Sequence, residues 1–171
     1  WKDINNKKYL YAYFKKYENI WHHGDYASNT KNNGFIIHGR SDATLNSGGM
    51  RIGTAEIYRI VENINGIEEC MAVEKILKND TKVILFIKVS KNKIFDQSLN
   101  NEIKKQIKVN LSPKFLPAKI INVKDIPKTK SGKIVELMVK KIINGQKIEN
   151  LSSLSNPECL KEFESLKKTI I

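Results

Sequence analysis

The sequence of 171 residues has no long uninterrupted run of apolar side chains. A membrane-spanning helix needs about 18 or more consecutive apolar residues, so no such helix is expected. The first residues, Trp-Lys-Asp-Ile, provide neither a starting methionine nor the apolar stretch of a secretory leader. We therefore expect this N-terminus to be a cut, and the chain to be the tail of a longer protein.

Cysteine and histidine are both scarce, with two and three residues respectively. Cys70 and Cys159 stand alone, without the paired spacing of a zinc site. His22 and His23 are adjacent and would point in opposite directions on a strand, and no Cys or carboxylate completes a tetrahedron with His38. No metal site is expected. Two isolated thiols indicate a reduced protein of the cytoplasm.

Acidic side chains are few: 18 Asp and Glu face 30 Lys and Arg, giving a net charge of +12. This excess could indicate nucleic-acid binding. The lysines, however, are scattered among asparagines along the whole chain instead of forming one stripe with interleaved aromatics. We interpret them as a solvated surface and expect no specific nucleic-acid partner, although the positive field should attract nucleotides and CoA. A basic interaction module without catalysis remains the alternative from another class.

Apolar periodicity predicts an α+β fold, a small mixed sheet with helices packed on it. Residues 29–34 are expected to form a turn between two strands, and residues 35–37 to form a short buried run. The loop over residues 41–53 holds three of the nine glycines. Thr54 then follows as the expected N-cap of a helix.

Downstream, two buried strands are predicted around residues 71–73 and 83–87, and a further strand over 120–123. A helix is expected over residues 99–111, because its apolar residues are four apart and Pro113 follows. The last predicted helix has an apolar face formed by Ile134, Leu137, Met138 and Ile142. The aromatic residues within 1–20 should form an exposed apolar patch. Residues 146–171 are read as a polar extension with a short helix near 157–166.

The segment Pro-Lys-Thr-Lys-Ser-Gly-Lys-Ile, residues 127–134, joins a loop to a helical pattern. A phosphate-binding P-loop needs a glycine five residues before Gly132 and a Ser or Thr after the lysine. Pro127 and Ile134 occupy those positions, so the segment is not a P-loop. It instead presents Lys133, whose long stem and three donors can reach a phosphate or a carboxylate.

Three upstream segments complete a pattern with this loop: Trp-His-His-Gly-Asp-Tyr at 21–26, Ile-Ile-His-Gly-Arg-Ser-Asp at 36–42, and Asn-Ser-Gly-Gly-Met-Arg-Ile-Gly-Thr-Ala-Glu-Ile at 46–57. In this order and spacing the four segments resemble the last motifs of the adenylate-forming enzymes. That family includes acyl-CoA synthetases, luciferases and peptide-synthetase adenylation domains. The resemblance covers residues 20–145.

The resemblance implies a domain organisation. Residues 1–41 would be a remnant of the large N-terminal adenylation domain, and residues 42–145 would be the C-terminal lid domain that carries the catalytic lysine. Residues 146–171 would be a C-terminal extension. The lid's main partner would then be its own missing N-terminal domain.

The resemblance also implies roles for single residues. Lys133 would be catalytic in adenylation. Asp25 would hold the two ribose hydroxyls of ATP or AMP, since a carboxylate can accept both hydrogen bonds. Arg40 would contact the same ribose or the adenylate phosphate. From the residues alone, Asp25 could equally stabilise its own turn, and Arg40 could form a surface ion pair.

Three further roles concern the second half-reaction. Asp42 resembles the hinge residue about which the lid turns between two catalytic poses. Gly48 and Gly49 would line the channel for the pantetheine arm of CoA, where a side chain would block the thiol. Arg51 would reach the adenylate phosphate in that pose.

Asn46 departs from luciferases and many other members, which have lysine at this position. Asparagine there is similar to the branch of the family that activates acetate and acetoacetate. The resemblance therefore implies an AMP-forming acyl-CoA ligase that uses ATP with Mg²⁺ and coenzyme A. Acetoacetate is the expected acid, with acetate or propionate as alternatives, and a fragment of this length is not expected to be active alone.

Overall fold

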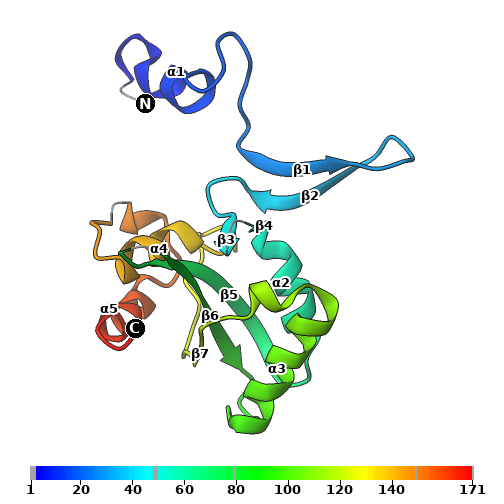
Figure 1. Ribbon diagram of the computed structural model, residues 1–171. Coiled ribbons are helices and arrows are strands. Elements are labelled where there is room, and N and C mark those ends of the chain that lie inside the picture. Colours follow the sequence, from blue (N-terminus) through cyan, green and yellow to red (C-terminus); the bar gives the residue numbers. More distant parts are fainter. Residues whose placement is uncertain (1–2, 48–49, 79, 149, 171) are drawn as a thin grey trace.

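The computed structural model describes residues 3–47, 50–78, 80–148 and 150–170 (Figure 1). Its helices are α1 (Lys7–Phe14), α2 (Thr54–Val61), α3 (Gln97–Asn110), α4 (Glu136–Ile143) and α5 (Leu160–Leu166). Its strands are β1 (Asp25–Asn29), β2 (Phe35–Arg40), β3 (Leu45–Ser47), β4 (Met50–Ile52), β5 (Ile67–Ile76), β6 (Thr81–Val89) and β7 (Lys119–Asn122). Among the described residues, no helix has the length and apolar character needed to cross a membrane.

A three-stranded mixed sheet forms the centre, in the order β5-β6-β7. Strand β5 is antiparallel to β6, and β6 is parallel to β7, with Leu85 opposite both Ala72 and Ile120. Successive side chains of a strand point to opposite faces. Leu85 and Ile87 accordingly pack with α2 and α3, whereas Ile84 and Phe86 pack with α4 and α5. The sheet is thus covered by helices on both faces, as the α+β prediction requires (Figure 1).

The helix predicted over residues 99–111 is α3, and its buried residues are Leu99, Ile103 and Ile107. Asp96 caps its start, because its side chain accepts a hydrogen bond of 2.9 Å from the N–H of Leu99. The helix ends before Pro113, as expected.

The apolar face predicted for the last helix is partly wrong. Helix α4 begins only at Glu136, because Ile134 still forms a β-bridge with Lys128 in the preceding loop. Its buried residues are Met138, Val139, Ile142 and Ile143, while Leu137 is partly exposed.

The segment after residue 145 contributes to the apolar core on the side of the sheet that α4 and α5 cover, which we call the second core. Its predicted short helix is confirmed as α5 with a 3-10 turn before it. Leu154, Leu160 and Phe163 are buried there, and the rings of Phe163 and Phe86 meet edge to face at 4.9 Å. This segment therefore has an apolar inner side as well as a polar outer one.

The buried run predicted at residues 35–37 is wrong. Strands β1 and β2 form a two-stranded antiparallel sheet of their own, and helix α2 approaches β2 near His38 rather than at residues 35–37. Phe35 is 74% exposed, and Ile36 and Ile37 are also exposed. Helix α1 and this ribbon stand apart from the central sheet (Figure 1). The N-terminal aromatic residues gather around Trp21, which stacks on Tyr13 at 4.3 Å.

The glycine-containing loop over residues 41–53 includes a second small hairpin, in which β3 pairs with β4. The N-cap predicted at Thr54 is wrong by one residue, because Gly53 caps α2 and Thr54 is already helical. Gly53 is required at this point: a Cβ atom on it would lie 1.9 Å from the carbonyl oxygen of His38. The start of α2 can therefore approach β2 closely only without a side chain.

Candidate functional site

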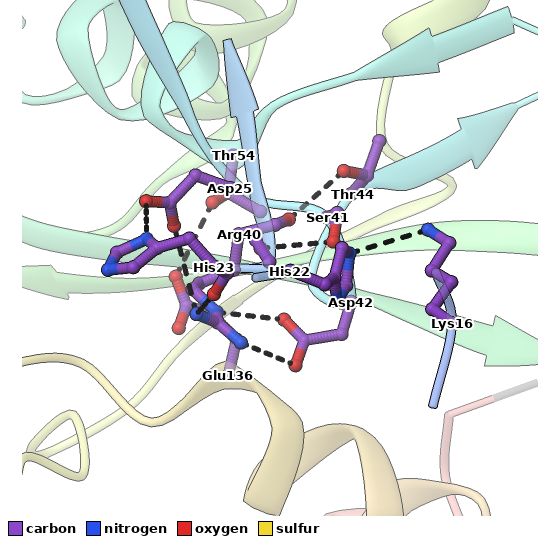
Figure 2. Close-up of polar contacts among 11 residues, drawn as sticks. Lys16, His22, His23, Asp25, Arg40, Ser41, Asp42, Thr44, Thr54 and Glu136 are labelled. Atoms are coloured by element: carbon purple, nitrogen blue, oxygen red, sulfur yellow. Dashed lines mark hydrogen bonds and ion pairs between the residues drawn. The ribbon is translucent and has the colours of Figure 1, made fainter. Parts of the chain in front are cut away.

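Asp25 and Arg40 face each other across the β1–β2 ribbon. Asp25 begins β1, Arg40 ends β2, and the two residues are register partners. Their side chains lie at the same end, with Arg40 Nη1 3.8 Å from Asp25 Oδ1 (Figure 2). The pairing of two motifs 15 residues apart thus places a carboxylate beside a guanidinium.

Gly24 makes this approach feasible. Its φ of +88° lies in the left-handed region, which favours glycine. A Cβ atom at this position would lie 2.8 Å from Nη2 of Arg40. The Gly-Asp sequence of the first motif therefore has a structural reason: the glycine leaves room for the guanidinium that Asp25 faces.

Arg40 is also held by Asp42, two residues further on. Its Nε and Nη2 donate to the two carboxylate oxygens of Asp42 at 3.2 and 3.3 Å. Its Nη1 donates to the carbonyl of His23 at 2.9 Å. The hydrogen bond from Arg40 to Asp42 raises the pKa of the guanidinium above its usual value, although partial burial opposes this effect. Arg40 therefore remains a fixed positive charge between two carboxylates.

The second carboxylate oxygen of Asp25 contacts a histidine. Asp25 Oδ2 lies 2.5 Å from Nδ1 of His23, whose side chain is 72% exposed. Because that imidazole is largely in solvent, it can turn away at little cost. Asp25 can then offer its oxygens to a pair of hydroxyl groups.

A cleft of about 350 Å³ opens beside these groups. Its lining comes from the N-terminal helix, from the first motif and from the second motif: Ala12, Tyr13, Trp21, His22, His23, Gly24, Arg40, Ser41 and Asp42. The cleft combines aromatic walls with one fixed cation. This combination suits a ligand that has a flat ring and an anionic group.

Asp42 lies between two anchored neighbours. On one side, the N–H and the hydroxyl of Ser41 both donate to the carbonyl of Gly24, at 2.8 and 3.0 Å. On the other side Ala43 is buried, and the Thr44 hydroxyl donates to the carbonyl of Arg40 at 3.0 Å. The contacts of Arg40 with Asp42 and Thr44 thus span this position, whereas the Ser41 anchor lies before it (Figure 2).

The hairpin β3–β4 presents Arg51, which is exposed and pairs with Asn46 across the strands. Gly48 and Gly49 lie outside the described residues. The hairpin is tied to the central sheet by Glu74 of β5, whose carboxylate accepts from the backbone N–H of Asn46. The same carboxylate pairs with Lys140 Nζ of α4 at 2.7 Å. Sequence reasoning missed Glu74; an acid directly after the apolar run of residues 70–73 in β5 was the available signal.

Lys133 is exposed at the end of a tight turn. The Thr129 N–H donates to the carbonyl of Lys133 at 2.8 Å, and the Lys133 N–H donates to Thr129 Oγ1 at 3.1 Å. Gly132 has a φ of +83°, which favours glycine in the turn. These hydrogen bonds thus fix the backbone of the loop, while the exposed side chain of Lys133 extends into solvent.

The start of α4, just after this loop, is joined to α2. Glu136 accepts hydrogen bonds from Thr54 Oγ1 at 3.4 Å and from the Tyr58 hydroxyl at 3.1 Å. The Tyr58 hydroxyl accepts from the N–H of Ala72 in β5 at 3.2 Å. Burial raises the pKa of Tyr58 well above its usual value, and the nearby Glu136 adds to this shift. The phenol therefore stays protonated and can keep donating to Glu136.

Three of the predicted site residues thus lie in one cluster, and two others lie apart from it, Arg51 on the hairpin and Lys133 on its loop. Asp25, Arg40 and Asp42 come together. Within the part of the chain that the structure describes, no contact joins Arg51 or Lys133 to that cluster. The described residues also include no group of three or more His, Cys, Asp or Glu placed to hold a metal ion.

The comparison with known families identifies the class. Residues 56–133 match the family model described as the AMP-binding enzyme C-terminal domain. This chain belongs to the AMP-binding enzymes and contains their C-terminal domain.

Within that family, the chain corresponds to the C-terminal portion of acetoacetyl-CoA synthetase. It is 46% identical over 168 residues to the acetoacetyl-coenzyme A synthetase of Rhizobium meliloti, covering 98% of this chain and 26% of that protein. It is 41% identical to the acetoacetyl-CoA synthetase of Gallus gallus, covering 97% of this chain and 25% of that protein. The chain therefore spans about a quarter of the length of the relatives it matches.

A solved structure agrees with these relatives. The acetoacetyl-CoA synthetase from Streptomyces lividans superposes with a TM-score of 0.90 at 34% sequence identity. The match covers 99% of this chain and 26% of that one. It includes the N-terminal ribbon as well as the central sheet with its helices, so the fold described above is the fold of the corresponding part of that enzyme.

Proposed function

We propose that this chain is the C-terminal portion of an AMP-forming ligase that joins acetoacetate to coenzyme A. In the first half-reaction the acid's carboxylate attacks the α-phosphorus of ATP, forming acyl-adenylate and releasing pyrophosphate. In the second, the CoA thiol attacks the acyl carbon and AMP leaves. Acetoacetate is proposed as the acid because the relatives are named acetoacetyl-CoA synthetases. The observation that carries the proposal is the Asp25–Arg40–Asp42 cluster, which lies apart from the exposed loop that presents Lys133 and from the hairpin β3–β4.

Asp25 and Arg40 are proposed to hold the nucleotide. Asp25 would exchange its contact with exposed His23 for the two ribose hydroxyls. Arg40, already fixed as a cation, would contact the ribose or the adenylate phosphate. Mg²⁺ would arrive with ATP as part of the substrate.

Lys133 is proposed as the catalytic residue of adenylation. Its ammonium would neutralise charge on the acid's carboxylate and on the α-phosphate oxygens as they come together. Such charge neutralisation and positioning dominate catalysis of phosphoryl chemistry. The exposed position of Lys133 on a hydrogen-bonded turn supports this role, because the ammonium must reach a site formed by another domain.

The second half-reaction is proposed to follow a rotation of the lid about Asp42. Rotation would withdraw Lys133 and bring Gly48, Gly49 and Arg51 to the nucleotide, so that the thiol could pass the two glycines. The Arg40–Asp42 pair that rotation must break is about half exposed, and such pairs contribute about 0–1 kcal/mol. This ion pair would therefore add little to the energetic cost of the rotation.

We infer that the ligase works in the cytoplasm, where free Cys70 and Cys159 would remain reduced. Its small-molecule substrates would be the acid, ATP and CoA, and the rest of the active site would come from its own N-terminal domain. Acetate or propionate remain the alternative acids.

Substitution of Lys133 by alanine tests the proposal in the complete ligase, in which this chain is joined to its N-terminal domain. Pyrophosphate exchange should fall by at least about 100-fold, consistent with loss of one electrostatic group at the reacting centre. Transfer of the acyl group from preformed acyl-adenylate to CoA should be unchanged. Lys130→Ala, in the same loop, is the matched control and should leave both rates unchanged. Equal loss of both half-reactions in Lys133→Ala would contradict the two-pose assignment.

Substitution of Gly49 by leucine should have the opposite effect. An added side chain would fill the path of the thiol, so thioester formation should collapse while pyrophosphate exchange stays near normal. If pyrophosphate exchange falls equally, the hairpin has a structural role instead.

A further inference from the structure

The loop that carries Lys133 lies beside a segment from near the C-terminus, residues 153–156, which we call the C-terminal clamp. The N–H of Ser155 donates to the carbonyl of Lys128 at 2.9 Å, and the N–H of Lys130 donates to the carbonyl of Ser153 at 3.1 Å. These two bonds run between antiparallel backbones. The clamp therefore serves as a short third strand for the first arm of the lysine loop.

The clamp is itself firmly placed. Leu154, at its centre, is buried and forms a β-bridge with Thr129 of the loop. The following helix α5 buries Leu160 and Phe163 against the sheet. Apolar burial of this extent is the dominant stabilising term in folding, so the clamp is held by the second core.

Asn156, the last clamp residue, uses both ends of its side-chain amide. Its Oδ1 accepts from the N–H of Lys128 at 2.9 Å. Its Nδ2 donates to the carbonyl of Ile126 at 2.9 Å and also to the carboxylate of Asp125. A carboxamide is suited to this position because it carries an acceptor and two donors on one planar group. An aspartate could satisfy the acceptor role but not the donor role, and alanine neither.

Hydrogen bonds and one peptide linkage, between Lys128 and Thr129, connect Asn156 to Lys133. Asn156 and Ser155 fix the N–H and the carbonyl of Lys128. The next residue, Thr129, is bonded to Lys133 through its own N–H and through its hydroxyl. Lys128 also forms an ion pair with Glu69 of β5, which fixes the same arm from the sheet side.

We propose that Asn156 is a positioning residue for adenylation: through the clamp it holds the loop in the shape that presents Lys133. This inference rests on the role proposed above for Lys133. It also assigns a task to residues 153–156, which lie outside the four segments at 21–26, 36–42, 46–57 and 127–134.

Amide hydrogen exchange of the present chain tests the clamp without any assay of activity. Asn156→Ala should increase exchange at Thr129, Lys130 and Gly132 by about tenfold or more, because a partly buried hydrogen-bond network is lost. Exchange in β5 and β6 should remain slow. Asn110→Ala, on α3, is the matched control and should change neither region. If exchange rises evenly over the core, or does not rise in the loop, the clamp assignment is overturned.

Asn156→Asp is the conservative variant, and it keeps the test open if the alanine variant does not fold. It preserves the shape and the acceptor for the Lys128 N–H, but it cannot donate to Ile126 and places a second carboxylate against Asp125. The loop amides should again exchange faster than those of the unmodified chain.

The half-reactions of the complete ligase test the positioning role. Asn156→Ala and Asn156→Asp should each lower the kcat of pyrophosphate exchange by about tenfold, while acyl transfer from preformed acyl-adenylate stays unchanged. A merely structural role would reduce both half-reactions together. Unchanged pyrophosphate exchange would overturn the inference. If Lys133→Ala also left pyrophosphate exchange intact, the proposed function would fail as well, and that variant distinguishes the two failures.

Discussion

Loss of the Lys140 ammonium should destabilise the lid more than loss of the whole Glu74–Lys140 pair. The Glu74 side chain is only 9% exposed, and its carboxylate joins the β3–β4 hairpin, through Asn46, to helix α4, through Lys140. Lys140→Met would leave that carboxylate buried with the Asn46 N–H as its remaining donor. Removal of one partner from a buried pair typically costs about 3–5 kcal/mol.

The magnitude here should be smaller than that range. The Lys140 side chain is 26% exposed, so the pair is partly solvated and the cost of Lys140→Met should be about 2–3 kcal/mol. The double variant Glu74→Met/Lys140→Met removes both charges. Because apolar replacement of a buried ion pair is often neutral or stabilising, the double variant should cost less than Lys140→Met alone.

Urea unfolding of the chain, followed by circular dichroism, measures these free energies of unfolding. For a chain of this size, 2–3 kcal/mol should also lower Tm by roughly 4–12 °C. Lys141→Met, on the next position of α4, is the matched control and should lie within about 0.5 kcal/mol of the unmodified chain. The reasoning is refuted if Lys140→Met costs less than about 0.5 kcal/mol, or if the double variant costs the sum of the two single variants.

Three further predictions concern single positions. Gly53→Ala should lower the free energy of unfolding by about 3 kcal/mol, since its Cβ would lie 1.9 Å from the His38 carbonyl oxygen; tolerance in a urea titration would contradict the close approach. Burial tends to raise the pKa of Asp125, but bonds from Asn156 and Lys88 hold it below its ordinary value of 3.8. The unmodified chain should therefore exceed Asp125→Asn in stability by roughly 0.5–1 kcal/mol at pH 6, and this difference should shrink as the pH falls below about 4; a difference independent of pH would refute this. Burial raises the pKa of Cys159 to about 11, so a thiol reagent should label it slowly at pH 8 and much faster at pH 10; rapid labelling at pH 8 would contradict this burial.

Much of the central sheet could be predicted because its signals are local. The apolar run around residues 83–87 and the four-residue spacing of Leu99, Ile103 and Ile107 are readable directly, and both elements formed as predicted. The run at residues 35–37 has a similar apolar signal, yet it is exposed. Apolar composition indicates that a face is to be covered but does not say whether the covering element lies within the same chain.

The candidate site was predictable only where a motif resembled a known family. Asp25, Arg40 and Asp42 were named from their motifs; the ribbon register brings Asp25 to Arg40, and Asp42 pairs with Arg40 from two residues further on. Glu74 and Asn156 lie outside the four segments to which site roles were assigned, and their importance comes from partners 28 to 66 residues away in the sequence. Such long-range polar pairing depends on how α4 and the C-terminal segment pack on the sheet, which spacing along the chain does not encode.

The Glu74 bridge has a kinetic consequence under the proposed function. Because one carboxylate fastens the glycine hairpin and the helix after the lysine loop to the same sheet, the two loops must travel as one body. A reporter on each loop should then relax with a single shared rate constant after acyl-adenylate forms. Withdrawal of Lys133 from the nucleotide and arrival of the CoA channel would then occur in the same movement. CoA could therefore not enter while adenylation was still under way.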